Sequence, residues 1–497
     1  MLTALERGVA GVTLFGSNVG EDEQLTELTK RLRGATQQPL LAIDEEGGDV
    51  TRIAHLTGSP HPGNAALGAV DETDLTERVH RAIGADLAAA GINLDLAPLV
   101  DVNTADGNPV IGTRAFGADP GLVARHAAAA VRGLQMAGVA ACAKHFPGHG
   151  STLEDTHHVT ATVSGGLDTL RRRDLPPFEE AIAAGVRGVM TGHLRVPELT
   201  GDLPATLSPA ALTGLLRNRL GFRGVIVTDA LEMRAIRDTY GIREGAVLAA
   251  AAGADLLCLG RNVDEQAYLA VRDALVTAVR DRRLEGGRLE EAAARVAELR
   301  RWLGGAVAGQ AAHGAGQPGA AVGLVAARRA ARLSRRPLSG KPLSGKPLSG
   351  RPLSGMPPAL RDPLVVQVER PANIAVGMVP WGLGPWIPDG DLLQVPISGR
   401  TDAGAADAAR TVLERAAGRS LIVVVRDAHR DAAARAMTVA VLAARPDTTV
   451  VEMGLPVWRP EVGAYLATYG ASRANSQAAA EILGLVRNSA RPARRGP

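Results

Sequence analysis

The chain has 497 residues, of which 46% are hydrophobic, 22% are charged and only 3% are aromatic, and its formal net charge is +3. This composition is typical of a folded protein with cores of Ala, Leu and Val, and it excludes a mostly disordered chain. The small net charge does not favour a nucleic acid partner. Two distant cysteines exclude a disulfide scaffold, and no apolar run reaches the length of about 18 residues that predicts a membrane span.

Short apolar runs alternate with amphipathic helical stretches throughout residues 1–303, which we assign to a first domain. The runs that we predict as strands are 9–15, 39–44, 92–100, 139–145, 186–193, 224–229 and 254–259. Strands that alternate with helices form parallel sheets with right-handed crossovers, and this length favours a closed (β/α)₈ barrel of the TIM type. An eighth strand is not evident, so we expect the first strand of the barrel to be missing.

Residues 304–358 are predicted to be a linker, because they are rich in Gly, Ala, Arg, Pro and Ser and repeat Pro-Leu-Ser-Gly. Residues 359–497 then resume an α/β pattern. The predicted strands are 364–368, 374–379, 392–397, 421–425 and 449–453, and the predicted helices are 403–417, 430–444 and 476–485. This pattern indicates an open α/β sandwich domain that lacks a glycine-rich nucleotide-binding turn.

Titratable residues follow most of the predicted barrel strands. They are Asp44, Asp101, Lys144, His193 and Asp229. Each of them alone could be a capping or surface residue. In a barrel of parallel strands, however, the carboxyl ends and the loops after them form the working face. Taken together, these residues predict a pocket that binds a polar ligand through carboxylates and cations.

The loop after the fourth predicted strand carries the strongest motif, Lys-His-Phe-Pro-Gly-His-Gly at 144–150 with Asp-Thr-His at 155–157. Gly and Pro after a buried strand prevent a helix from starting at once, so we expect a long loop. Asp155 and His157 would point the same way in an extended segment, which lets the carboxylate orient the imidazole. His145, His149 and His157 lack the spacing of helical metal ligands, and no metal site is predicted.

These motifs together resemble the family 3 glycoside hydrolases, in their β-N-acetylglucosaminidase branch. Besides the 144–157 loop, the matching segments are Ala-Ile-Asp-Glu-Glu-Gly-Gly-Asp-Val-Thr-Arg at 42–52, Ala-Pro-Leu-Val-Asp-Val-Asn at 97–103, Asn-Pro-Val-Ile-Gly-Thr-Arg-Ala-Phe at 108–116 and Val-Thr-Asp-Ala-Leu-Glu-Met at 227–233. Tyr-Leu-Ala-Thr-Tyr-Gly-Ala at 465–471 is similar to the family's C-terminal α/β domain.

The resemblance implies a retaining mechanism, in which one carboxylate attacks the anomeric carbon and a second group protonates the leaving oxygen. It assigns the nucleophile to Asp229 and the acid/base to His157, held by Asp155. The chain departs from the family pattern at Ala230, where an acidic residue usually follows the nucleophile, and at Asp49, where the family often has arginine. No cofactor is expected. The expected substrate-binding residues are Asp44, Arg52, Arg114, Lys144, His145, His193 and Met233.

Three functions remain open for this site. The first is a retaining exo-β-N-acetylglucosaminidase, a β-N-acetylhexosaminidase acting on peptidoglycan-derived muropeptides or chitooligosaccharides. The second is a β-N-acetylglucosaminide phosphorylase on the same fold, and the third is a non-catalytic sugar-binding protein. We expect a small-molecule sugar substrate, no nucleic acid partner and a monomer. We also expect a cytoplasmic location, with export instead if sequence upstream of Met1 supplies a leader.

Overall fold

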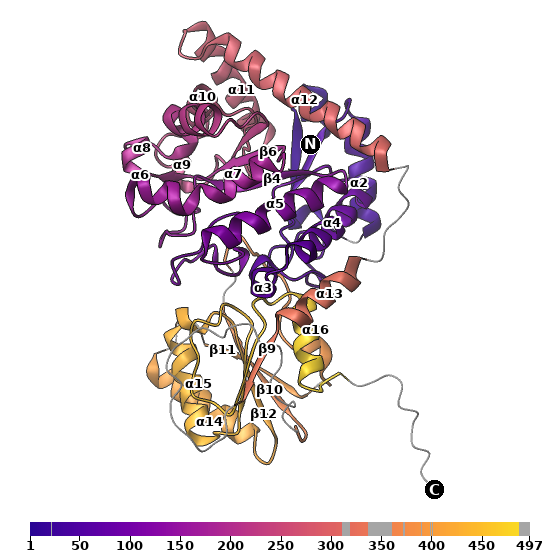
Figure 1. The fold of residues 1–497 in the computed structure, drawn as a ribbon, viewed down its shortest axis with the longest axis vertical. Helices are drawn as coiled ribbons and strands as arrows, with labels where there is room; N and C mark the ends of the chain where they lie inside the picture. Colours follow the sequence, from indigo (N-terminus) through magenta and orange to yellow (C-terminus); the bar gives the residue numbers. More distant parts are fainter. Residues whose placement is uncertain are drawn as a thin grey trace.

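A computed structural model describes residues 1–310 except Glu21, residues 319–335, and residues 360–486 except positions 371, 372, 389, 398 and 400. The Pro-Leu-Ser-Gly repeats lie outside the described residues. Figure 1 shows a larger N-terminal domain joined to a smaller C-terminal domain. None of the helices that the structure describes is both long and apolar enough to cross a lipid bilayer.

The N-terminal domain is built on a parallel sheet of six strands in the order β1-β2-β3-β4-β6-β8. Buried apolar runs form these strands, which explains why the sequence pattern predicts them. They are β1 (Gly11–Leu14), β2 (Leu40–Ile43), β3 (Leu94–Asp95), β4 (Ala140–Phe146), β6 (Gly188–Thr191) and β8 (Val225–Thr228), and a small pair is formed by β5 (Ala161–Thr162) and β7 (Leu194–Arg195).

The predicted strand at 254–259 is reduced to a single bridge, in which Leu256 pairs with Val227 beside β8. Within the described residues, no ladder joins this segment to β1, and a cavity of about 670 Å³ lies between them. The barrel is therefore open on the side where the sequence lacks an eighth strand. The prediction of an α/β barrel fold with one strand missing is confirmed.

Ala-rich helices surround the sheet, and small residues let them pack closely. A Cβ atom on Gly133 would lie 2.3 Å from the carbonyl oxygen of Glu77, so the backbones of helices α4 and α5 approach each other closely at this glycine. This explains how a barrel core is filled with few aromatic residues. The helices are α1 (Leu2–Glu6), α2 (Asp22–Gly34), α3 (Asn64–Val70), α4 (Thr73–Ala89), α5 (Pro120–Met136), α6 (Gly166–Thr169), α7 (Pro176–Ala183), α8 (Pro197–Thr200), α9 (Arg234–Arg237), α10 (Ile242–Ala252), α11 (Glu265–Arg280) and α12 (Gly286–Gln310).

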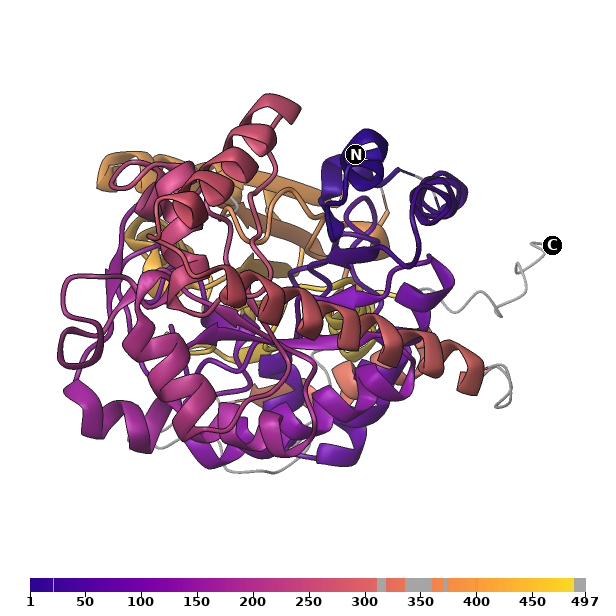
Figure 2. The same cartoon turned by 90° about the horizontal axis from the view of Figure 1, so that it is seen from above.

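Helix α12 closes the amino-terminal end of the barrel. Its Val296, Leu299 and Leu303 pack against residues inside the sheet, including Leu40 and Val225. Figure 2 shows this helix lying across the barrel, and Figure 1 shows the C-terminal domain at the opposite end. The C-terminal domain therefore lies at the carboxyl ends of the barrel strands, where a TIM-type barrel carries its site.

The C-terminal domain is a six-stranded sheet in the order β11-β10-β12-β13-β14-β9, parallel except for β9 at one edge. Helices α14 and α15 bury an apolar core on one face, and α16 covers the other. The elements are β10 (Leu364–Glu369), β11 (Leu392–Pro396), β12 (Leu421–Val425), β13 (Thr449–Glu452), β14 (Ala464–Ala467), α14 (Asp402–Arg415), α15 (Ala432–Ala444) and α16 (Arg473–Ile482).

Two expectations for this half of the chain are wrong. Part of the region expected as a linker forms α13 (Gly319–Ala330), which packs on α3, α4 and α16, and β9 (Arg332–Arg335), which pairs with β14. The composition of this region did not predict the helix and the strand, because Ala and Gly occur both in linkers and in closely packed helices. Residues 374–379 form turns rather than a strand, because the side chain of Asn373 accepts a hydrogen bond from the amide of Val376.

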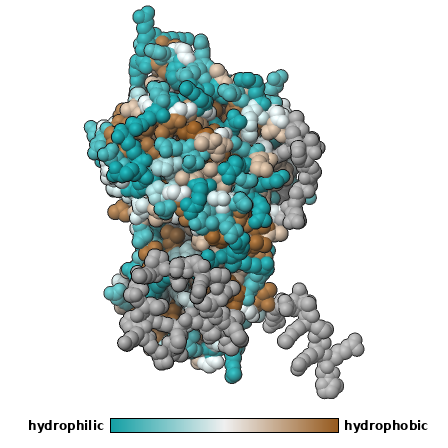
Figure 3. All heavy atoms as spheres, in the orientation of Figure 1, coloured by the Kyte–Doolittle hydropathy of each residue, from teal (hydrophilic) through white to brown (hydrophobic). Residues whose placement is uncertain are grey.

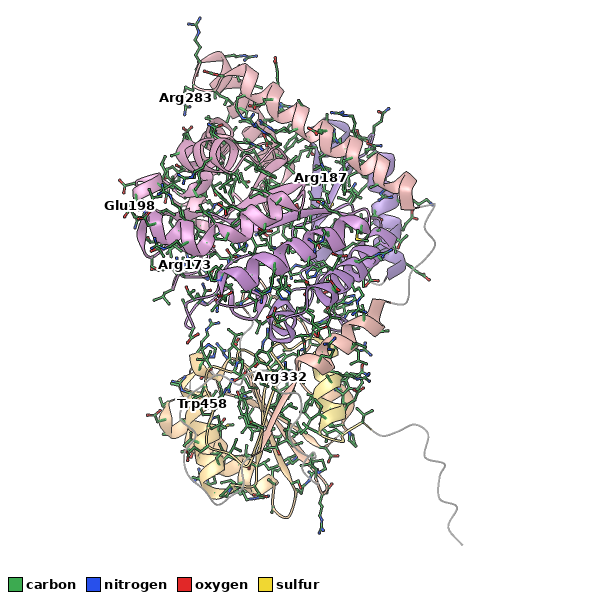
Figure 4. The ribbon with its side chains drawn as sticks, in the orientation of Figure 1. Arg173, Arg187, Glu198, Arg283, Arg332 and Trp458 are labelled. Atoms are coloured by element: carbon green, nitrogen blue, oxygen red, sulfur yellow. The ribbon has the colours of Figure 1, made fainter. Side chains whose placement is uncertain are left out.

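Polar contacts join the two domains. Asp49 accepts hydrogen bonds from Thr113 Oγ1 (2.7 Å) and the amide of Ala471 (2.9 Å), and it pairs with Arg426 (3.1 Å). Arg332, labelled in Figure 4, donates to the carbonyl oxygen of Ala69. Figure 3 shows hydrophobic residues at the surface along this junction. The aspartate at position 49, a departure from the family pattern, thus serves domain docking.

Candidate active site

A cavity of about 810 Å³ opens at the carboxyl ends of the barrel strands, and residues 374–379 of the C-terminal domain form part of its wall. Most of the residues predicted from the sequence line this cavity. Those that do are Asp44, Arg52, Arg114, Lys144, His145, His157, Asp229 and Met233. Asp155 and His193 lie behind this wall. Most of the titratable residues predicted at strand ends therefore lie together at one cavity. They come from the ends of four different strands.

A buried cluster of charges forms one side of the cavity. Lys144 Nζ lies 2.6 Å from Asp44 Oδ1 and 2.8 Å from Glu46 Oε1, and Arg114 binds both oxygens of Glu46 at 2.8 and 2.7 Å. Burial alone would raise the pKa of Glu46, but Arg114 and Lys144 hold it well below its usual range. The cluster is therefore fully ionised at neutral pH and presents fixed charges to a ligand. Sequence reasoning placed Glu46 with Asp44 and Glu45 at the end of the second predicted strand but gave it no specific partner.

Removing the shared carboxylate of this cluster should destabilise the fold. In Glu46→Ala, Arg114 and Lys144 lose a buried partner, and we expect the free energy of unfolding to fall by about 3–5 kcal/mol. The pKa of Glu46 is lower in the folded protein than in the unfolded chain, so its contribution to the free energy of unfolding is fully present at a pH above the unfolded pKa. That contribution is lost as the pH falls through the folded pKa. Urea unfolding at neutral pH measures the effect. Glu77→Ala, which breaks an exposed pair with Arg132, is the control and should change stability little.

His145 is oriented by an aspartate that the sequence analysis noted only as a strand-end residue. Its Nδ1 lies 2.8 Å from Asp101 Oδ2, and Asp101 Oδ1 accepts the amide of His149 at 2.6 Å. Burial would raise the pKa of Asp101, but His145 and His149 lower it, so this carboxylate stays ionised. With Nδ1 donating to Asp101, the Nε2 atom of His145 is the ring nitrogen left for a ligand.

Asp155 and His157 meet through a turn rather than through an extended segment. Asp155 Oδ1 accepts from both the amide (2.9 Å) and the ring Nδ1 (2.7 Å) of His157. Burial would raise the pKa of Asp155, whereas the hydrogen bonds from His157 lower it, and the net shift is downward. The predicted contact is therefore present, although the local geometry expected for it was wrong. The pairing leaves Nε2 of His157 as the ring atom available for proton transfer.

The loop that carries this pair, residues 147–158, is anchored at its base. His149 Nδ1 lies 2.6 Å from Thr152 Oγ1, and its Nε2 lies 3.1 Å from Thr156 Oγ1. Arg173, labelled in Figure 4, donates to Ser151 Oγ at 2.8 Å. These contacts give the His157 side chain a defined place at the cavity wall, with 23% of it exposed.

Asp229 follows β8 and lies on the side of the cavity opposite the charge cluster. Its Oδ1 accepts the amide of Ala230 at 2.8 Å. Burial alone would raise the pKa of Asp229, but the rings of His193, His145 and His157 and this amide lower it below its usual value. The carboxylate is therefore ionised at neutral pH, which is the state that a nucleophile requires.

His193 and Arg52 make contacts that differ from the expected substrate binding. The buried ring of His193 lies 2.9 Å from Thr206 Oγ1 and 3.0 Å from the carbonyl oxygen of Ala230, so both nitrogens have partners within the protein. Arg52 lines the cavity but donates to the carbonyl oxygens of Ala375 (2.7 Å) and Val376 (3.3 Å) in the C-terminal domain. Nothing in the sequence indicated this second contact, because the partners lie more than three hundred positions away.

Within the described residues, no group of three or more His, Cys, Asp or Glu side chains is arranged to hold a metal ion. The cavity is lined by both carboxylates and imidazoles. An ionised carboxylate and a carboxylate-paired imidazole line one cavity that also holds fixed charges. This arrangement can perform nucleophilic attack together with acid/base catalysis.

Comparison with known proteins agrees with this chemistry. The sequence profile of the glycosyl hydrolase family 3 N-terminal domain matches residues 3–299. A β-hexosaminidase from Stenotrophomonas maltophilia is 40% identical over 292 residues, which are 56% of this chain and 86% of the relative. The β-hexosaminidase LpqI of Mycobacterium tuberculosis is 37% identical over 296 residues, which are 57% of this chain and 75% of the relative.

A solved structure extends the similarity across both domains. The family 3 β-N-acetylglucosaminidase from Paenibacillus sp. str. FPU-7 superimposes with a TM-score of 0.81 at 33% sequence identity. The match covers 96% of this chain and 91% of that one. The chain therefore belongs to glycosyl hydrolase family 3, and it is a glycoside hydrolase related to the bacterial β-hexosaminidases.

Proposed function

We propose that the protein is a retaining exo-β-N-acetylglucosaminidase that releases terminal β-linked N-acetylglucosamine from muropeptides or chitooligosaccharides. The observation that carries this proposal is the pairing of His157 with Asp155 on the wall of the cavity that also exposes Asp229. The names of the relatives, β-hexosaminidase and β-N-acetylglucosaminidase, support the sugar class.

In the first step, a carboxylate oxygen of Asp229 attacks the anomeric carbon as the glycosidic C–O bond breaks. The leaving oxygen takes a proton from the imidazolium of His157, which gives a glycosyl-aspartate and a free aglycone. In the second step, neutral His157 accepts a proton from a water molecule whose oxygen attacks the same carbon. The sugar leaves with its configuration retained, and both side chains return to their starting protonation states.

The charge cluster opposite Asp229 suits the recognition of sugar hydroxyls. Asp44 accepts hydrogen bonds as a carboxylate, whereas Lys144 and Arg114 donate them. Hydrogen bonds to charged groups contribute about 1.5–3 kcal/mol each when they are shielded from water. Because the cluster is pre-paired in the absence of ligand, its charges are already oriented when a sugar binds.

The test is hydrolysis of 4-nitrophenyl N-acetyl-β-glucosaminide with and without inorganic phosphate. We expect nitrophenol and free N-acetylglucosamine in both cases, with the β-anomer seen first by NMR. Formation of N-acetylglucosamine 1-phosphate would identify a phosphorylase and overturn the hydrolase proposal. Binding of N-acetylglucosamine without turnover would identify a non-catalytic protein.

The aspartate of the dyad can be tested by removing its charge. Burial raises the pKa of Asp155, but the hydrogen bonds from His157 lower it overall, so Asp155 is a carboxylate at neutral pH. In Asp155→Asn a neutral amide replaces the carboxylate that orients the ring of His157, so we expect kcat/KM for chitobiose to fall by about 10²- to 10⁴-fold. Steady-state kinetics measures the loss, and wild-type rates would contradict the role of Asp155.

A further inference from the structure

One end of the active-site cavity is closed by the C-terminal domain. We call residues 373–379 the end-wall segment, since 374–379 line the cavity. Its shape is set locally: Asn373 Oδ1 accepts the amide of Val376 at 2.8 Å, and the carbonyl oxygen of Asn373 accepts the amide of Gly377. Gly377 has a φ of +72°, which other residues adopt with strain. The segment is thus a shaped turn of the protein.

The end-wall segment is attached to the barrel by both polar and apolar contacts. Arg52 donates to the carbonyl oxygens of Ala375 and Val376, and Asn373 Nδ2 donates to the carbonyl oxygen of Pro109 at 3.3 Å. The Ala375 side chain packs in an apolar cluster formed by the loops after β3, namely Leu99, Val110, Ile111 and Ala115. These contacts make the segment part of the barrel mouth.

Strand order places the end-wall segment on the side of the cavity remote from the nucleophile. Arg52 follows β2 and Pro109 follows β3, whereas Asp229 follows β8. In the sheet order, β3, β4 and β6 separate β2 from β8 along the barrel wall, so their carboxyl ends lie on opposite sides of the mouth. A sugar ring whose anomeric carbon reaches Asp229 therefore turns its non-reducing end toward Asp44 and the end-wall segment.

We propose that the end-wall segment makes the enzyme exo-acting, by occupying the space that a second sugar on the non-reducing side would need, and that Arg52 is the positioning residue that holds it there. This inference rests on the proposed function, because it assumes attack by Asp229 on the ring in the cavity. It gives the C-terminal domain a direct part in substrate selection.

The experiment uses 4-nitrophenyl β-chitobioside, because its two glycosidic bonds report which sugar occupies the cavity. The wild-type protein should first release N-acetylglucosamine and leave the nitrophenyl monosaccharide. Two variants open the wall. Arg52→Ala removes both bonds to the segment, and a second variant replaces residues 374–378 with two glycines. Both should release nitrophenol together with intact chitobiose, a product that the wild type does not form.

On the nitrophenyl monosaccharide Arg52→Ala should remain active, because the two hydrogen bonds that it removes go to the end-wall segment. Arg52→Lys can keep only one of the two bonds, so it should form less chitobiose than Arg52→Ala. Arg426→Ala is the matched control. It removes the ion pair with Asp49 between the same two domains, and Arg426 does not line the cavity.

The outcomes separate the two proposals. Chitobiose from either wall variant, with none from Arg426→Ala, supports the inference. Folded wall variants that hydrolyse the nitrophenyl monosaccharide but never form chitobiose overturn it and leave the proposed function intact. A wild-type protein that leaves the nitrophenyl monosaccharide unhydrolysed overturns the proposed function itself. Arg52→Ala keeps every apolar contact of the segment, so it decides the question if the glycine replacement does not fold.

Discussion

Asp229→Ala should lower kcat for the nitrophenyl monosaccharide by roughly 10⁴ to 10⁶-fold, the scale of loss when a covalent catalytic group is removed. Without the carboxylate no glycosyl-enzyme can form, and water is not positioned to replace it. The fold should survive, because among the described contacts the Asp229 side chain accepts one hydrogen bond, from the amide of Ala230. Steady-state kinetics combined with thermal unfolding measures both effects.

Two further measurements make the nucleophile assignment specific. Azide is small enough to enter the space left by the carboxylate, and it should restore turnover of Asp229→Ala with inversion of configuration at the anomeric carbon. In the wild type, a slowly turned-over fluorinated N-acetylglucosaminide should leave an adduct on Asp229, located by mass spectrometry of peptides. An adduct on another residue, or near-normal activity of Asp229→Ala, would contradict the assignment.

His157→Ala should separate substrates by the quality of their leaving groups. For chitobiose, whose leaving oxygen needs a proton, we expect kcat/KM to fall by about 10²- to 10⁴-fold, the usual range for a general acid. For a 2,4-dinitrophenyl glycoside, which leaves without protonation, cleavage of the glycosidic bond should change little. Release of the sugar from Asp229 should then become the slow step, because the base for water is absent, and it should show as a burst of dinitrophenol.

Glu154→Ala is the matched control for this variant. Glu154 lies on the same loop and is exposed, but it does not line the cavity. Its replacement should leave both substrates close to wild-type rates. Equal losses for activated and unactivated substrates in His157→Ala would contradict the acid/base role.

The residues that we propose as catalytic could be placed at the cavity from sequence because each belongs to a short motif. Asp155 and His157 are two positions apart, and the contact between them forms within one turn. Asp229 follows a buried strand directly, so its place at the barrel mouth follows from the strand itself. Local spacing was sufficient in both cases, even though the extended geometry expected for the dyad was replaced by a turn.

The sequence did not predict which residues pair with one another around the cavity. Glu46 and Arg114 are 68 positions apart, and Asp101 and His145 are 44 apart. Each residue has a recognisable position after a strand, but a strand-end position does not say which cation meets which carboxylate. His193 shows the same limit, since it follows a strand and yet its ring is turned away from the cavity toward Thr206.

The pattern of apolar residues also gave wrong predictions for the elements at the domain junction. Residues 374–379 have the apolar composition of a strand, but the Asn373 side chain and the positive φ of Gly377 bend them into the end-wall segment. The short strands β9 and β14 were not predicted. The arginine-rich β9 has the composition of a linker, and its partner β14 lies far from it in the sequence.

The sequence alone therefore determined the order of most strands and helices of the N-terminal domain, the barrel class and the residues that we propose for the chemistry. These properties depend on the alternation of apolar runs and on short motifs, which are local. Only the tertiary structure decided that Arg52 holds a segment of the C-terminal domain, that Glu46 is shared by two cations, and that the cavity has a closed end. These contacts join residues far apart in the chain, and their pairing depends on how whole domains pack together.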